Sequence, residues 1–137
     1  MNSYYVNGGQ GLIITSSKPY GIIRGTLRKW KKTGIVACNS CAKACETGGR
    51  EKMEELAERL RKDGFNIVDT HLVPLTCNIA LATKPEYNSD ELVILACDSG
   101  VFTYQMLFPE KKIIPGLNTI GLGARDGDGN LYLMKRF

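Results

Sequence analysis

Two short, uninterrupted apolar runs constrain this fold more than any other feature of the sequence. The runs are Gly34–Cys38 and Glu91–Cys97, and neither shows the alternation of a strand with one wet face. Such runs are typical of strands buried on both faces, as in a parallel sheet covered by helices. Each run ends in a cysteine.

The segments around these runs alternate between helical and extended patterns. Ile23, Leu27 and Trp30 recur at helical spacing, which predicts the buried stripe of a helix that ends near Gly34. Residues 50–63 carry an apolar stripe among charged residues and are followed by Gly64, as expected of a complete helix. Further strands are expected at 12–14, 65–73 and 112–115, further helices at 79–82 and from 99 onward, and an extended segment at 131–137.

This alternation predicts an α/β fold. We expect a single three-layer domain over residues 1–137, with a mainly parallel, Rossmann-like sheet. The length of 137 residues is that of one domain, and no repeat or linker divides the sequence.

Composition narrows the functional classes. The net charge of +4 is mild and its Lys and Arg are spread along the chain, which argues against nucleic-acid binding. No stretch reaches the roughly 18 apolar residues that span a bilayer, so no membrane contact is expected. The segment Met1–Gly11 lacks the zones of a signal peptide, which predicts a cytoplasmic protein. Five cysteines in that compartment favour metal or redox chemistry over a disulfide framework.

The cysteines follow the predicted strands. Cys38 and Cys97 end the two buried runs, and Cys77 follows the strand between them after a short Pro-Leu-Thr extension. Because the carboxyl ends of parallel strands share one edge of the sheet, we expect these three residues to be neighbours there.

The spacing of Cys38, Cys41 and Cys45 predicts that the three wrap one metal centre. Lys43, Arg50 and the start of the following helix add positive charge that favours thiolates. A 4Fe–4S cubane takes four thiolates, so Cys97 or Cys77 must supply the fourth, with Cys97 favoured. Zinc is the competing metal, because it also accepts tetrahedral thiolate sites.

Other polar motifs are weaker. The Asp126–Asn130 segment lacks the glutamate that closes a calcium loop, and a hairpin turn is expected there instead. His71 lies within a predicted strand and is interpreted as a satisfied structural residue. No nucleophile–base pair was found, so no catalytic residue is assigned.

The cysteine motif also resembles a known family. The segments Val36–Gly49, Val73–Cys77, Leu95–Val101 and Pro115–Thr119 resemble the small, MetV-type subunit of two-subunit methylenetetrahydrofolate reductases. This domain is also called the methylenetetrahydrofolate reductase C-terminal domain. The resemblance extends over about residues 12–123.

The resemblance implies an accessory subunit, not catalytic alone, that exchanges electrons with the flavin-containing reductase subunit in one-carbon metabolism. It maps the metal-binding cysteines of the family onto Cys38, Cys41, Cys45, Cys77 and Cys97. Longer members continue into a further cysteine-rich segment, whereas this sequence ends at Phe137. A further electron-carrier protein is therefore expected as a second partner. The alternative is a structural zinc module that shapes the same complex.

Overall fold

A computed structural model describes residues 10–137, and its core is a parallel sheet. The strands of this sheet lie in the order β3-β2-β4-β5 and all run parallel. Their bounds are β2 Lys32–Cys38, β3 Asn66–Val73, β4 Glu91–Leu95 and β5 Lys112–Pro115. The predicted parallel α/β architecture is confirmed at this level. The segment judged for a signal peptide lies almost wholly outside the described residues.

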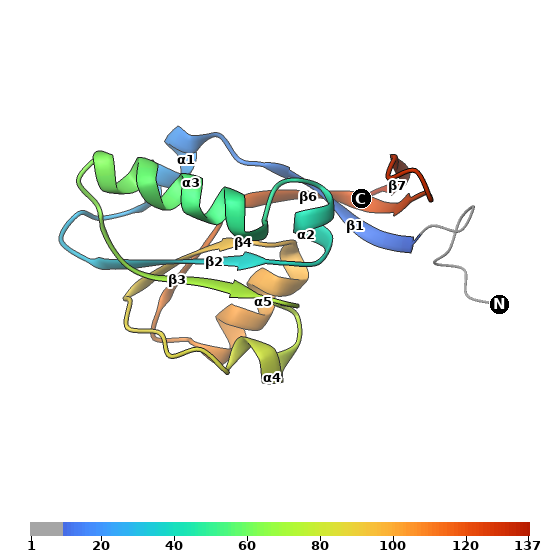
Figure 1. Ribbon diagram of the computed structural model, residues 1–137. Coiled ribbons are helices and arrows are strands. Elements are labelled where there is room, and N and C mark those ends of the chain that lie inside the picture. Colours follow the sequence, from blue (N-terminus) through green and yellow to red (C-terminus); the bar gives the residue numbers. More distant parts are fainter. Residues whose placement is uncertain (1–9) are drawn as a thin grey trace.

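Helices cover both faces of the sheet, as Figure 1 shows. The chain leaves β2 toward β3 through α3, then crosses back to β4 and continues outward to β5 through α5. Because parallel crossovers are right-handed, opposite directions of travel place the connecting helices on opposite faces. The helices are α1 Tyr20–Thr26, α2 Cys41–Ala44, α3 Gly49–Lys62, α4 Ile79–Ala82 and α5 Asp98–Leu107.

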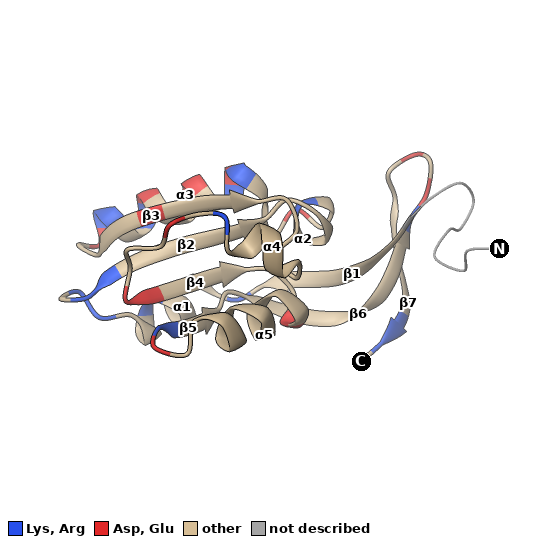
Figure 2. Cartoon of the chain, turned by 90° about the horizontal axis from the view of Figure 1, so that it is seen from below, with Lys and Arg blue, Asp and Glu red and all other residues tan. Residues whose placement is uncertain are grey.

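The two helical layers differ in charge (Figure 2). Helix α3 buries Met53, Ala57 and Leu60 against the sheet and exposes a mixed charged face. Helices α4 and α5 carry little charge, with Asp98 in the first turn of α5. The central strands β2 and β4 are buried from both sides, which explains their unbroken apolar sequence.

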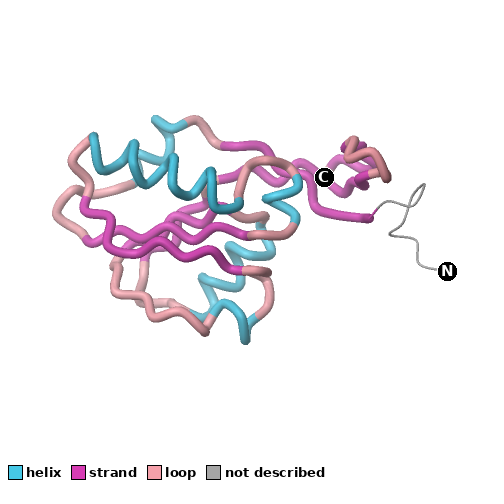
Figure 3. Tube along the Cα trace, viewed as in Figure 1, coloured by secondary structure: helices cyan, strands magenta, loops and turns pink. Residues whose placement is uncertain are grey.

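A second, antiparallel sheet was not predicted. It consists of β1 Gln10–Ser17, β6 Leu117–Arg125 and β7 Leu131–Arg136, in the order β1-β6-β7. Figure 3 shows it as a separate group of strands beside the parallel sheet. The expected strand at 12–14 therefore belongs to this sheet, and the turn at Asp126–Asn130 joins β6 to β7.

Short contacts attach this second sheet to the carboxyl edge of the parallel sheet. The Gly116 N–H donates to the Ile94 carbonyl over 2.9 Å, and the Asp98 N–H donates to the Thr119 hydroxyl over 2.9 Å. The Thr15 and Thr47 hydroxyls share a buried hydrogen bond of 2.7 Å. The second sheet is thus a wall beside the loops that follow β2 and β4.

One helix prediction was wrong at its end. Helix α1 ends at Thr26, so only Ile23 of the predicted stripe is both helical and buried. Leu27 is buried just beyond the helix, whereas Trp30 is 78% exposed. Leu27 is buried by the loop after α1 and not by a helix, so its apolar character did not mark a continued helix.

Candidate metal centre

Cys38 and Cys97 lie at the place where the strand order of the parallel sheet reverses. Cys38 is the last residue of β2 and is only 5% exposed. Cys97 follows β4 after Ala96, is half-buried, and precedes α5 as its N-cap residue. Strands β2 and β4 are direct neighbours, yet their following helices cover opposite faces. This is the crevice in which open α/β sheets bind ligands.

Cys77 is exposed and lies in the loop between β3 and α4. The preceding residue, Thr76, is 1% exposed and packs against Gly100 of α5. A Cβ atom at Gly100 would meet Thr76 and would also lie 2.8 Å from the Ala96 Cβ. The absence of a side chain at Gly100 therefore lets the Cys77 loop approach the start of α5.

Electrostatic effects show that Cys77 and Cys97 are close to other thiols. Burial raises the pKa of the Cys77 thiol, and the Cys97 and Cys38 thiolates raise it further. The hydroxyl of Ser99 partly offsets this rise in the Cys77 pKa.

The pKa of the Cys97 thiol is also raised, first by burial. The N–H groups of Gly100 and Ser99, at the start of α5, lower it, whereas the Cys41 and Cys38 thiolates raise it. Each added thiolate thus makes ionisation of the next one harder, which is the expected behaviour of like charges in a partly buried site.

Cys41 begins the short helix α2 and is half-buried. The loop after α2 folds back so that the Thr47 and Gly48 N–H groups both donate to the Ala42 carbonyl over 2.9 Å. Gly48 lies against the ends of both central strands, where a Cβ would be 2.9 Å from the Cys38 carbonyl oxygen. This tight return holds α2 over the carboxyl edge of the sheet.

Cys45 has a different neighbour from the other cysteines. It is the C-cap residue of α2, and its Sγ lies 3.6 Å from the Ile13 carbonyl oxygen of β1, in the second sheet. It is not among the main causes of the pKa shifts of Cys77 or Cys97.

The cysteines do not form a preassembled coordination sphere. All five thiols are free of disulfide bonds. Within residues 10–137, no three His, Cys, Asp or Glu side chains converge closely enough to hold a metal ion as they stand. Cys97 lies within electrostatic reach of Cys41 and Cys38, and Cys77 within reach of Cys97 and Cys38, whereas Cys45 contacts β1.

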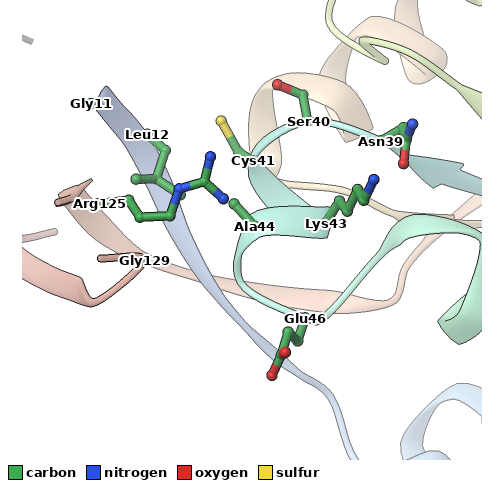
Figure 4. Close-up of a pocket in the computed structure, with 10 residues that line it drawn as sticks. All are labelled: Gly11, Leu12, Asn39, Ser40, Cys41, Lys43, Ala44, Glu46, Arg125 and Gly129. Carbon is green, nitrogen blue, oxygen red and sulfur yellow. The ribbon is translucent and has the colours of Figure 1, made fainter. Parts of the chain in front are cut away.

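A cleft of about 530 Å³ opens beside Cys41, between α2 and the second sheet (Figure 4). Its walls come from the start of β1, the loop and helix at 39–46, and the end of β6 with the turn that follows. The lining residues are Gly11, Leu12, Asn39, Ser40, Cys41, Lys43, Ala44, Glu46, Arg125 and Gly129. Another hollow, of about 730 Å³, shares Asn39, Lys43 and Glu46 with this cleft.

Sequence reasoning missed Arg125, Thr76 and Gly100. Arg125 reaches the cleft only because β6 pairs with β1, and no motif marks that strand. Thr76 and Gly100 matter through a contact between segments that are distant in the chain. By contrast, His71 fits its structural interpretation, since its Nε2 lies 3.1 Å from the Glu86 carbonyl oxygen.

Comparisons with protein-family models, curated proteins and solved structures gave no match to this chain. The resemblance to the methylenetetrahydrofolate reductase subunit therefore stays a prediction. No helix within residues 10–137 is long and apolar enough to cross a membrane.

Proposed function

We propose that the chain binds one 4Fe–4S cluster at the carboxyl edge of its parallel sheet, through Cys38, Cys41, Cys77 and Cys97. The observation that supports this proposal is that Cys38 and Cys97 follow adjacent strands at one edge of the sheet, where Cys38 and Cys41 are near enough to raise the pKa of Cys97 and where Cys38 and Cys97 are near enough to raise that of Cys77. Four thiolates are the number that such a cluster takes.

The chemistry of the donor set fits a cationic metal centre. Thiolates that raise the pKa of one another are costly to ionise together, and bound iron or zinc removes that cost. The N–H groups of Ser99 and Gly100 add partial positive charge beside Cys97. Cys38, being nearly buried, would hold its share of the centre away from water.

Cys45 is assigned a structural role in this proposal, although the sequence pattern placed it among the ligands. Its thiol faces the Ile13 carbonyl of β1 and would have to leave that contact to reach the other four. The α2–β1 contact positions the second sheet beside the candidate centre.

The wider role rests on the resemblance of the cysteine motifs. An iron–sulfur cluster, when bound, supplies one-electron transfer. The chain would act in the cytoplasm as an accessory electron-transfer subunit of the flavin-containing methylenetetrahydrofolate reductase subunit. A further carrier protein would supply or remove electrons. The chain alone would not reduce folate.

The metal is tested by anaerobic purification followed by iron, sulfide and zinc analysis and visible spectroscopy. We expect about four iron atoms per chain and absorption that bleaches on addition of dithionite. A colourless protein with stoichiometric zinc would overturn the iron–sulfur proposal and favour the structural zinc module.

The ligand set is tested by a matched pair of variants, Cys97→Ser and Cys45→Ser. Cys97→Ser should lose most of the cluster, whereas Cys45→Ser should retain it, because only Cys97 lies among the other thiols. Equal cluster content in the two variants would contradict the proposed set.

The partner is tested by co-expression with the flavin-containing reductase subunit encoded in the same genome. We expect a complex that survives size-exclusion chromatography and in which reduced cluster reduces the flavin. Separate elution, with no electron transfer between the two proteins, would contradict the partnership without bearing on the cluster.

A further inference from the structure

The cleft beside Cys41 has the size of a ligand site. Its volume of about 530 Å³ falls within the usual range of pockets for small organic molecules. It lies between the parallel-sheet half of the molecule, which supplies α2, and the second sheet, which supplies β1 and β6. No part of the proposed electron-transfer role requires this hollow.

Two cations line the cleft without a carboxylate partner. Neither Arg125 nor Lys43 forms a salt bridge with a carboxylate of residues 10–137, although both are exposed. Arg24, Arg28 and Arg50, by comparison, are all paired with acids. Unpaired cations from two elements that meet at one hollow leave it with positive charge that the chain does not neutralise.

The side chains in Figure 4 show how a ligand would meet these charges. The Arg125 guanidinium extends from β6 toward Ala44 and Cys41, whereas Lys43 extends on the other side of α2, toward Asn39. Glu46 supplies the acid among the lining residues, and its side chain extends away from Arg125. The negative charge on Glu46 therefore does not occupy the space in front of the guanidinium.

We propose that this cleft binds a small organic anion carrying a phosphate or carboxylate group. Arg125 would hold the anionic group with its forked N–H donors, which match both oxyanions. Lys43, whose ammonium lies on the other side of α2, would add only longer-range positive potential, and Leu12 would contact the uncharged part of the ligand. Because the Cys41 thiol lines the same cleft, an occupant would cover it.

Binding is tested by calorimetry on the full chain at low ionic strength. The probes are pyrophosphate, citrate and FMN, with riboflavin as the matched molecule that lacks the phosphate. We expect at least one of the anions to bind and riboflavin not to. Preference for pyrophosphate and FMN would identify a phosphate site, and preference for citrate a carboxylate site. Absence of binding by all three anions would overturn the proposal.

Two pairs of variants separate this cleft from general surface charge. Arg125→Gln should weaken binding by about tenfold or more, because it removes the forked donor from the site, whereas Lys43→Gln should weaken it less, because the Lys43 ammonium lies on the other side of α2. Arg136→Gln and Lys135→Gln remove the same charges from exposed positions of β7, which do not line the cleft, and should leave binding unchanged. Equal weakening in both pairs would overturn the assignment of the site.

Alkylation of the metal-free chain provides a second readout. Saturation with the bound anion should slow the reaction of Cys41 with iodoacetamide and leave that of Cys77 unchanged, because Cys77 does not line the cleft. Equal rates at Cys41 with and without the anion would show that it binds elsewhere. Neither measurement depends on cluster binding.

Discussion

The ionisable groups at the two edges of the parallel sheet have opposite kinds of neighbour. At the amino edge, the Glu91 carboxylate is 1% exposed and lies beside cations of the same chain. The backbone N–H of Arg28 donates to its Oε1 over 3.2 Å, and the Arg28 Nε and Lys112 Nζ lie 3.9 and 3.6 Å from its Oε2. At the carboxyl edge, burial raises the pKa values of Cys97 and Cys77, and neighbouring thiols raise them further.

This difference indicates which edge is structural and which is open to a ligand. The charge of Glu91 is balanced by Arg28 and Lys112 of the same chain, although its Oε2 accepts no hydrogen bond within residues 10–137. At the carboxyl edge, neighbouring thiols raise the pKa values of Cys77 and Cys97, so ionisation of one thiol disfavours ionisation of the next. The buried, paired carboxylate fits a structural role for the amino edge, and the less buried thiols of Cys77 and Cys97 fit the binding role proposed for the carboxyl edge.

Alanine substitutions at two glycines, one near each edge, test this comparison, and they have the largest expected effect on stability. Gly34→Ala at the amino end would place a Cβ 2.6 Å from the Ser89 Oγ and 2.7 Å from the Leu92 Cδ2. Gly100→Ala at the carboxyl edge would press on Thr76 and Ala96. Each should lower the free energy of unfolding by about 1–3 kcal/mol, because overpacking forces neighbours to move.

The two variants should differ in metal content, measured after anaerobic reconstitution. Only Gly100→Ala moves the Cys77 loop away from α5, so only it should lose a large part of the cluster. Equal metal loss in Gly34→Ala would mean that cluster binding follows global stability, and the functional distinction between the edges would fail.

The fold was predictable where local sequence and burial agree. Residues 35–38 of β2 and 92–95 of β4 are buried and apolar throughout, and that pattern was visible in the sequence. Strand β6 was missed because Gly121 and Gly123 interrupt its pattern. A Cβ at Gly123 would lie 2.5 Å from the Tyr132 carbonyl oxygen, so these glycines reflect contacts with β7 that the local sequence does not reveal.

The candidate site was likewise predictable only where its residues follow strands that the sequence reveals. Cys38 and Cys97 were identifiable because they follow recognisable strands. The surroundings of Cys45 depend on β1, which pairs within a sheet that was not predicted. The position of Arg125 depends on the same sheet. Contacts between the two sheets therefore set the limit of sequence reasoning here.

A charge removal at the amino edge should have a smaller effect. Glu91→Gln keeps the shape of the side chain but removes the charge that faces Arg28 and Lys112. We expect the free energy of unfolding to fall by about 1–2 kcal/mol, measured by urea denaturation, because the Arg28 backbone N–H then bonds to a neutral oxygen and the pairing with Arg28 and Lys112 is lost. Metal content should not change.

The matched control is Glu58→Gln on the exposed face of α3. Glu58 pairs with Lys62 over 3.2 Å, but both side chains are exposed, so the loss should stay below about 0.5 kcal/mol. If the two variants were equally stable, the pairing of Glu91 with Arg28 and Lys112 would not be the structural element proposed here.

The smallest expected effect concerns Tyr104, which lies in α5 between the two edges. Burial raises the pKa of Tyr104 far above its usual value, and the Tyr87 hydroxyl, 2.7 Å away, raises it further. Tyr104→Phe removes this hydrogen bond and should lower the free energy of unfolding by about 1 kcal/mol at neutral pH. Metal content should be unchanged, since no ligand is touched.

The pH dependence of this variant has a definite sign. The folded state holds the Tyr104 phenol neutral, whereas the unfolded chain releases its proton near pH 10. Stability from the neutral phenol is therefore fully present below about pH 10 and decreases as the pH rises further. The phenylalanine variant lacks this decrease, so the stability difference from wild type should shrink above about pH 10 in urea unfolding. A constant difference across that range would show that the Tyr104 phenol ionises equally in the folded and unfolded chains. The Tyr104 side chain would then not be shielded from water as its burial indicates.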